Sequence, residues 1–172
     1  MADIVFVFEV HQPHRLRRNF FWENRLFKRV KKKNFFPYYF DDAVNREVFI
    51  RACEKCYFPS NRILLDLIDE YKKEKKQLKV SFSISGVFLE QCEAFNPDLL
   101  DSFRQLAETG CVEFLSQTYY HSLASLYPEK EEFIEQVKMH RQTVKDLLGQ
   151  DSVIFENTEL IYNNVIARTI EK

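Results

Sequence analysis

"LKVSFSISG", from Leu78 to Gly86, is the stretch of sequence that indicates the class of fold. Its apolar residues Val80, Phe82 and Ile84 alternate with polar ones, which is the period of a strand with one buried face. A short helix is expected directly after Gly86. A strand that leads at once into a helix is the unit from which parallel sheets are built.

The same unit recurs on both sides of this stretch. Further strands are predicted at residues 3–10, 111–117 and 152–158. The helices expected between and after them cover 20–33, 41–57, a segment capped by Ser60, 97–109, 128–149 and the residues from 163 onward. Strand and helix therefore alternate four times. This pattern predicts an α/β fold of parallel βα repeats, either an open doubly wound sheet or part of a βα barrel.

Composition indicates a globular chain. It has 172 residues, of which 45% are hydrophobic and 17 are Phe, and we expect a single domain over 1–172. No apolar run approaches the roughly 18 residues of a membrane span. The first residues, "MADIVFVFEV", lack the basic residues of a signal peptide. We therefore expect a cytoplasmic protein with no membrane partner.

Glycine and cysteine usage excludes two kinds of site. The three glycines, Gly86, Gly110 and Gly149, form none of the glycine-rich loops that hold phosphates, so nucleotide chemistry is not expected. Cys53 and Cys56 form a CxxC pair, but no second pair follows, as a zinc ribbon would require. We expect buried, reduced thiols and no cofactor.

Polar clusters follow three of the four predicted strands. They are "HQPHRLRR" (11–18), "SQTYYHSL" (116–123) and "ENTE" (156–159). The carboxyl ends of parallel strands form one rim, where the sites of both candidate architectures lie. His11, His14 and His121 belong to these clusters, whereas His140 falls within a predicted helix and is expected at the surface.

Strand alternation predicts which acids reach this rim. If 152–158 is a strand, Phe155, Asn157 and Glu159 share one face and Glu156 points the other way, toward the helices. On the first strand Glu9 and His11 likewise share a face. We therefore expect Asn157 and Glu159 in the pocket. The alternative is that Glu159 only opens the next helix, where an acid is favoured by the helix dipole.

The three clusters resemble conserved regions of glycoside hydrolase family 57, which contains archaeal and bacterial α-amylases and 4-α-glucanotransferases. The matching stretches are "HQPH" (11–14), "GCVEFLSQTYYHSL" (110–123) and "VIFENTELIYNN" (153–164), in the family's order. The resemblance covers essentially the whole chain. It implies an α-amylase-type enzyme that acts on α-glucans or maltooligosaccharides with retention. It also implies that the chain is the N-terminal part of an incomplete (β/α)7 barrel.

The resemblance also implies roles for individual residues. The catalytic nucleophile falls on Glu159. Substrate contacts fall on residues of the first two regions, namely His11, His14, Glu113, Tyr119, Tyr120 and His121. In the same setting the indole of Trp22 could stack on a sugar ring.

Two features depart from the family pattern. Glu156 occupies a position where the family usually has a basic residue. More important, retaining hydrolysis needs a second carboxyl group about 5–5.5 Å from the nucleophile. The family's acid/base is an aspartate well beyond the nucleophile, and residues 160–172 contain none. We therefore expect this chain to be inactive alone, with a second polypeptide as a candidate to complete the barrel.

Three alternatives remain open on these grounds. His11 and His14, with Glu113 or His121, could bind the metal ion of a hydrolase. Residues 15–33 hold nine Lys/Arg and one acid among aromatics, a pattern suited to single-stranded nucleic acid. The rest of the chain has 16 basic and 25 acidic residues, so we interpret the patch as a solvated helix face and expect no nucleic-acid partner. The third alternative is a non-catalytic binding or assembly module.

Overall fold

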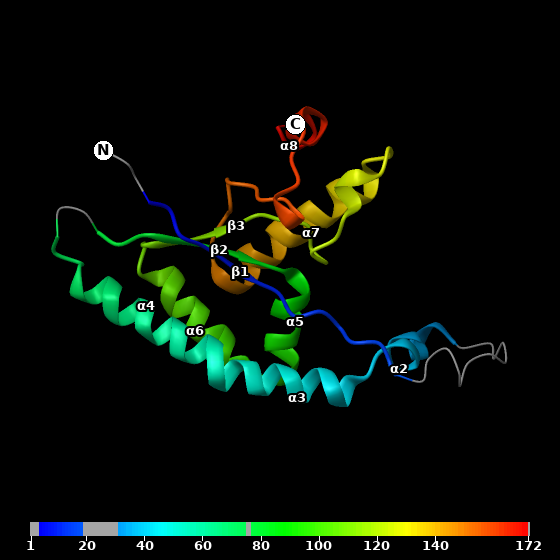
Figure 1. The fold of residues 1–172 in the computed structure, drawn as a ribbon, viewed down its shortest axis with the longest axis horizontal. Coiled ribbons are helices and arrows are strands. Elements are labelled where there is room, and N and C mark those ends of the chain that lie inside the picture. Colours follow the sequence, from blue (N-terminus) through cyan, green and yellow to red (C-terminus); the bar gives the residue numbers. More distant parts are fainter. Residues whose placement is uncertain (1–3, 19–30, 75–76, 172) are drawn as a thin grey trace.

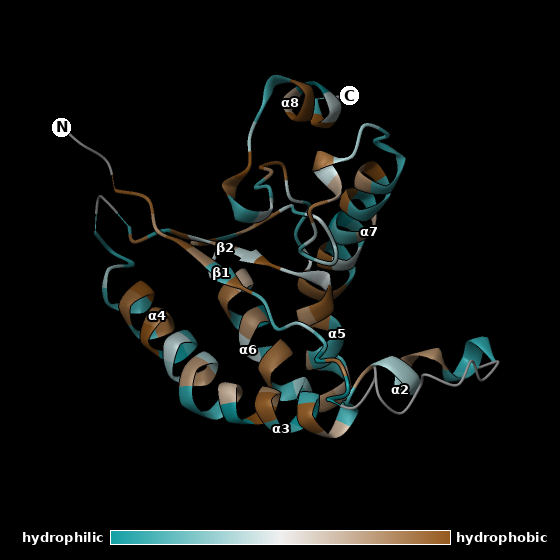
Figure 2. Cartoon of the chain, turned by 45° about the vertical axis from the view of Figure 1, so that its right-hand side comes forward, coloured by the Kyte–Doolittle hydropathy of each residue, from teal (hydrophilic) through white to brown (hydrophobic). Residues whose placement is uncertain are grey.

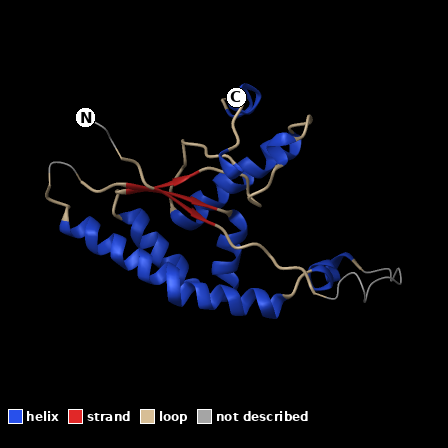
Figure 3. Ribbon diagram, viewed as in Figure 1, coloured by secondary structure: helices blue, strands red, loops and turns tan. Residues whose placement is uncertain are grey.

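Three parallel strands form the centre of the molecule (Figures 1 and 3). The computed structural model of the protein describes residues 4–18, 31–74 and 77–171. The strands are β1 (Val7–Val10), β2 (Val80–Ile84) and β3 (Val112–Leu115), and they lie in the order β1-β2-β3. Val7 pairs with Ser81, and Ser81 pairs with Glu113. The predicted α/β fold of parallel βα repeats is confirmed.

Helices follow each strand. After β1 come α2 (Phe35–Tyr39), α3 (Asp42–Ala52) and α4 (Phe58–Glu70), and after β2 come α5 (Gly86–Phe95) and α6 (Pro97–Glu108). The chain after β3 forms α7 (Glu131–Leu148) and α8 (Asn164–Ile170). Figure 1 shows α3 to α6 together on one side of the sheet. None of the helices in the described part of the chain is both long enough and apolar enough to cross a membrane.

The core lies between the sheet and these helices. Phe82 of β2 is 3% exposed, and its ring packs on Phe103 of α6 at 5.6 Å and on Phe114 of β3 at 5.7 Å between centroids. Buried apolar residues of α4, α5 and α6 belong to this core, and Figure 2 shows apolar stretches along these helices. The alternation predicted for residues 78–85 is confirmed, because Val80 and Ile84 are buried on the same face as Phe82.

The helix predicted to stop before Pro59 instead continues through it. A π-helical turn, Cys53–Tyr57, joins α3 to α4 without a break. Within it the Phe58 N–H donates to the carbonyl of Cys53, five residues earlier. This wider turn interrupts the usual i to i−4 ladder just where Pro59 has no N–H to offer. Ser60 consequently lies inside α4 and caps nothing.

The thiol prediction holds for most of the cysteines. Cys53, Cys92 and Cys111 are buried and free, but Cys56 is exposed because it faces outward from the π-turn. Burial raises the pKa of the Cys53 thiol to about 11, so that thiol stays protonated at neutral pH.

The fourth predicted strand is reduced to a single parallel bridge. Ser116 pairs with Phe155, and the rest of residues 152–158 has no strand geometry. Val153 is 83% exposed and Ile154 is 49% exposed. No other strand within the described ranges pairs with the outer side of this segment. One-sided pairing leaves little to stabilise an extended ladder.

His140 is buried, contrary to the surface position expected for it. Its ring in α7 has no exposed area, and Nε2 lies 2.6 Å from the carbonyl of Ile84. The Gln117 N–H donates to Nδ1 at 3.3 Å. The neutral ring therefore satisfies both partners, Nε2–H as donor and Nδ1 as acceptor. Burial lowers the pKa of His140 to about 4.

From the burial of His140 we predict that the folded protein is less stable at acid pH. An unfolded histidine titrates near 6.5, so between about pH 6.5 and 4 the unfolded chain binds more protons than the folded one. The free energy of unfolding should therefore fall as pH falls, by about 2 kcal/mol between pH 7 and 5 from His140 alone. Urea unfolding of the protein and of His140→Gln at both pH values measures the effect. An equal loss in the two proteins would contradict the assignment.

Candidate active site

The three polar strand ends come together at the carboxyl edge of the sheet. The segment after β3 and the segment around Phe155 are joined by two backbone bonds, Ser116 N–H to the Ile154 carbonyl at 2.8 Å and Glu156 N–H to the Ser116 carbonyl at 2.9 Å. The hydroxyls of Thr118 and Thr158, both buried, are 2.9 Å apart. These contacts hold the loop of His121 beside the turn of Glu159.

Two histidines from the segments that follow β1 and β3 stack on one another. The rings of His11 and His121 lie 4.6 Å apart between centroids, with 26° between their planes. His11 Nδ1 is 2.8 Å from the hydroxyl of Ser85, the residue that caps α5. Burial, and then the charges of His121 and His14, lower the pKa of His11 to about 4. His11 is therefore neutral at physiological pH and offers one donor and one acceptor.

His121 lies between two carboxylates. Its Nδ1 is 3.6 Å from Glu9 Oε1, and its Nε2 is 3.8 Å from Glu159 Oε1. The side-chain amide of Gln117 lies 3.0 Å from the same Nδ1. The Glu159 side chain is 71% exposed, so a ligand in solution can reach its carboxylate. This arrangement presents one exposed carboxylate beside two stacked rings.

Glu9 is a member of this cluster that the sequence marked only by its shared strand face with His11. Burial raises the pKa of Glu9, and the neighbouring carboxylate of Glu156 raises it further, while His121 acts in the opposite direction. Its side chain is 43% exposed at the rim. Alternation along β1 was the only signal that could have found it.

Backbone strain coincides with the cluster. Among the described residues other than glycine, those with left-handed backbone are His121, Glu159 and Leu160, at φ 50°, 58° and 55°. This region disfavours side chains with a Cβ atom and persists where the surroundings enforce it, often at functional sites. Two of these three residues are predicted site residues.

A second group orients His14. The hydroxyl of Tyr119 donates to Glu90 Oε1 at 2.7 Å, and Glu90 Oε2 is 4.0 Å from His14 Nε2. His14, followed by the Tyr119 hydroxyl, lowers the pKa of Glu90, whereas burial and then Glu90 raise the pKa of Tyr119. A Cβ atom on Gly86 would lie 2.4 Å from the Tyr119 ring, so this contact requires glycine.

The tyrosine pair therefore divides into two roles. Tyr119 is 5% exposed with its hydroxyl engaged, whereas Tyr120 is 48% exposed and packs edge-on against it. Only Tyr120 presents a ring to solvent. Glu90 is a residue that sequence analysis missed, because an acid in the middle of a predicted helix carries no distinguishing pattern.

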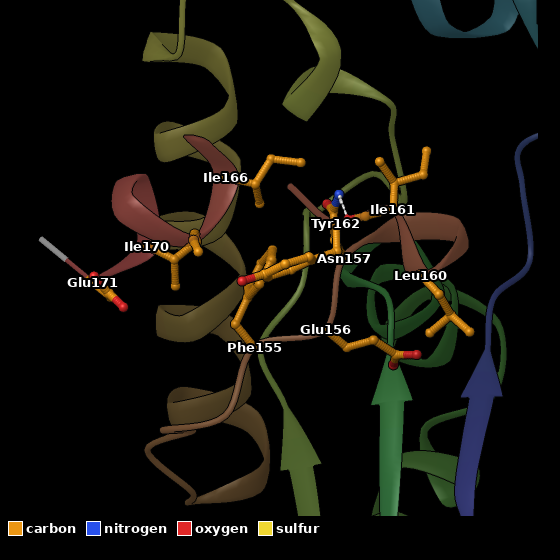
Figure 4. A pocket seen from close by; sticks show the side chains of 10 residues that line it. Phe155, Glu156, Asn157, Leu160, Ile161, Tyr162, Ile166, Ile170 and Glu171 are labelled. Carbon is orange, nitrogen blue, oxygen red and sulfur yellow. Dashed lines mark hydrogen bonds between the residues drawn. The ribbon is translucent and has the colours of Figure 1, made fainter. Parts of the chain in front are cut away.

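Strand alternation was wrong for the segment 155–159. Asn157 is buried and its amide donates to the Ser125 hydroxyl at 2.9 Å and to the Ile161 carbonyl at 2.8 Å, so it braces the turn. Glu156, expected toward the helices, instead extends over the tip of β2, on the side of Glu9 (Figure 4). Side chains do not alternate between two faces here, because the chain turns into a 3-10 helix at Thr158–Leu160.

Two further site candidates lie elsewhere. Glu113 is near the amino end of β3 and lines an open cavity with Val5 and Lys79, at the opposite end of the sheet from the rim. That position argues against a substrate contact. Trp22, with most of the basic stretch 15–33, lies outside the described residues.

A hollow that Asn157 and Glu156 help to line has a different character. It measures about 370 Å³ and is lined mainly by apolar residues of the 155–162 segment and of α8, including Phe155, Tyr162, Ile166 and Ile170 (Figure 4). Among the described side chains, no group of three or more His, Cys, Asp and Glu is arranged to hold a metal ion.

Comparison with known proteins assigns the family. The profile of glycosyl hydrolase family 57 matches residues 5–172. The chain belongs to glycosyl hydrolase family 57. A Methanocaldococcus jannaschii family member, provisionally named alpha-amylase, is 45% identical over 171 residues, which cover 96% of this chain and 32% of the relative. The Pyrococcus furiosus alpha-amylase is 29% identical over 125 residues, covering 73% of this chain and 18% of the enzyme.

The fold of this family 57 chain also has solved counterparts. The crystal structure of 4-alpha-glucanotransferase from Thermococcus litoralis superposes with a TM-score of 0.67 at 22% identity, over 97% of this chain and 20% of that one. This likeness confirms the fold, that of a partial βα barrel. The chain spans about a third or less of the length of these relatives.

Proposed function

We propose that this chain carries the nucleophile side of a retaining active site that acts on α-glucans. The observation that carries the proposal is the exposed Glu159 carboxylate, which lies 3.8 Å from His121 Nε2 on a left-handed turn at the rim of the sheet. In the family resemblance this is the position of the nucleophile. Membership of glycosyl hydrolase family 57 supports the reaction class.

In the proposed reaction Glu159 attacks the anomeric carbon and forms a glycosyl ester as the leaving sugar oxygen departs. His121, between Glu9 and Glu159, keeps that carboxylate oriented. Neutral His11 offers a donor and an acceptor to sugar hydroxyls, and the exposed ring of Tyr120 offers a face for stacking. Hydrolysis and glucan transfer then differ in which acceptor, water or sugar, opens the ester.

The remaining step needs a general acid, which we propose is supplied by further βα units. Two open edges favour such units. Among the described strands, β1 pairs only with β2, and the neighbouring apolar residue Val5 is 75% exposed. At the other edge Val153 is 83% exposed. Unpaired apolar edges are costly and are normally covered. The covering strands belong either to a continuation of the chain or to a second polypeptide.

A chimera tests the proposed function. Residues 1–172 are joined to the part of the M. jannaschii relative that lies beyond the matched region, and release or transfer of sugar from amylose is measured. The relative itself, assayed in parallel, is the reference. We expect turnover of an α-glucan. A folded chimera that acts on no α-glucan would contradict the proposal and favour a non-catalytic module.

A cytoplasmic location stays a prediction.

The histidines are predicted to contact sugar and to bind no metal. His11 and His121 face one another in a stack, and His14 turns to Glu90, so their nitrogens do not converge on one point. Metal analysis of the purified chain should find no stoichiometric zinc, and a chelator should leave glucan binding unchanged. Stoichiometric zinc that is lost together with binding would favour the metal-hydrolase alternative.

A further inference from the structure

The π-turn between α3 and α4 brings a tyrosine hydroxyl to the loop that carries His11 and His14. Single π-turns within α-helices are rare and occur often at functional sites. Here the turn Cys53–Tyr57 ends at Tyr57, whose hydroxyl accepts a hydrogen bond from Gln12 Nε2 at 2.9 Å. Gln12 lies between the two site histidines, 45 residues away in sequence.

Gln12 points into the helical layer and is held there at three points. Besides the bond to Tyr57, the backbone carbonyl of Gln12 accepts a hydrogen bond from Nε2 of Gln91 at 2.6 Å. Gln91 is only 1% exposed. Its Oε1 accepts from Arg15 Nη2 at 3.0 Å. These hydrogen bonds of Gln12 hold the loop in place, whereas its neighbour His11 faces the candidate site.

Tyr57 is itself fixed in place. Its ring packs edge-on against Phe88 of α5 at 5.0 Å between centroids. Burial raises the pKa of its phenol, so the hydroxyl stays neutral. Each residue of an α-helix advances by about 100° around the helix axis. If an ordinary α-helical turn replaced the π-turn, Tyr57 would therefore point in a different direction relative to α3. The π-turn thus determines where the hydroxyl lies.

We propose that Tyr57 is a positioning residue of the active site, which acts through Gln12 to seat the His11–His14 loop against His121 and Ser85. This inference rests on the proposed function for its purpose. Its test does not, because the seating of His11 can be measured without any glucan.

Titration of the His11 ring, followed by NMR in the 172-residue chain, measures the seating. Burial lowers the pKa of this ring most, and the charged groups that lower it further are His121 and His14, while Glu9 and Glu159 face His121 instead. With a seated loop the pKa of His11 is about 4, so at about pH 5.5 only a few per cent of the rings are protonated. In Tyr57→Phe we expect the loop to loosen and about half or more of the His11 rings to be protonated at that pH.

Matched variants separate positioning from general loss of stability. Tyr71→Phe removes an exposed hydroxyl just past the end of α4 and should leave the His11 titration unchanged. Gln12→Ala keeps Tyr57 packed on Phe88 and should reproduce the shift, which covers the case in which Tyr57→Phe fails to fold. An unshifted His11 titration in folded Gln12→Ala, or an equal shift in Tyr71→Phe, would overturn the inference. A shift without any glucan binding would contradict only the proposed function.

Discussion

Replacing Glu159 with Gln is expected to lower α-glucan turnover by several orders of magnitude in a protein with a complete barrel. A neutral amide is a poor nucleophile and cannot form the glycosyl ester. The amide has nearly the same shape as the carboxylate, and this side chain is 71% exposed, so folding and glucan binding should be retained. The chimera with the M. jannaschii relative is the protein in which to measure turnover and binding together.

Glu113→Gln is the matched control. It makes the same chemical change at an acid in β3 that the resemblance had marked as a substrate contact. Because Glu113 lies at the amino end of the sheet, its replacement should leave turnover close to that of the parent. Near-normal turnover in Glu159→Gln, or covalent labelling of another residue by a mechanism-based inhibitor, would show that the nucleophile lies elsewhere.

The second large effect concerns the 172-residue chain by itself, which we expect to show little or no glycosidase activity. Without a general acid, the leaving sugar oxygen must depart as a poorly stabilised alkoxide. A positioned acid or base contributes about 10²–10⁴-fold, and loss of one member of a cooperating pair can cost more. No aspartate follows Glu159 in residues 160–172 to fill this role.

Turnover of amylose by the purified chain, compared with the chimera, measures this deficit. Addition of the remaining part of the relative as a separate polypeptide should restore activity if it docks on the open edges of the sheet. Amylose hydrolysis by the chain alone at an ordinary enzyme rate would refute the prediction. Glu9 would then be the first candidate for the acid, because its pKa is raised and it belongs to the same cluster as Glu159. Its Oε1 lies 3.6 Å from Nδ1 of His121.

Residue patterns alone predicted the parallel βα arrangement and the rim on which the site lies. Alternation in Val80, Phe82 and Ile84 places one face of β2 in the core, and this is a local property of the pleated backbone. Gly149 past the end of α7 adopts the left-handed conformation that closes many helices. The convergence of His11, His121 and Glu159 follows from topology, because parallel strands direct all their carboxyl ends to one edge.

Tertiary structure decided the direction of individual side chains at that rim. Glu159 does lie beside His121, yet it does so through a left-handed turn rather than through strand parity. Asn157 is turned inward by its bonds to Ser125 and Ile161. Local periodicity assumes that the backbone stays regular. Where the chain leaves the sheet, its dihedral angles are set by contacts between residues far apart in sequence, such as Thr118 with Thr158.

The sequence by itself therefore determined the class of fold, the edge that bears the candidate site and the nucleophile candidate, since each depends on short-range pattern and motif. Only the folded structure decided that Glu90 joins the candidate site and that His140 is buried beneath it. Strand alternation had placed Glu9 on the face of His11, but only the structure brought its carboxylate beside His121. Glu90 and His140 sit in unremarkable local sequence. Their roles arise from the desolvation and hydrogen bonding that distant elements impose on them, and no local pattern encodes those.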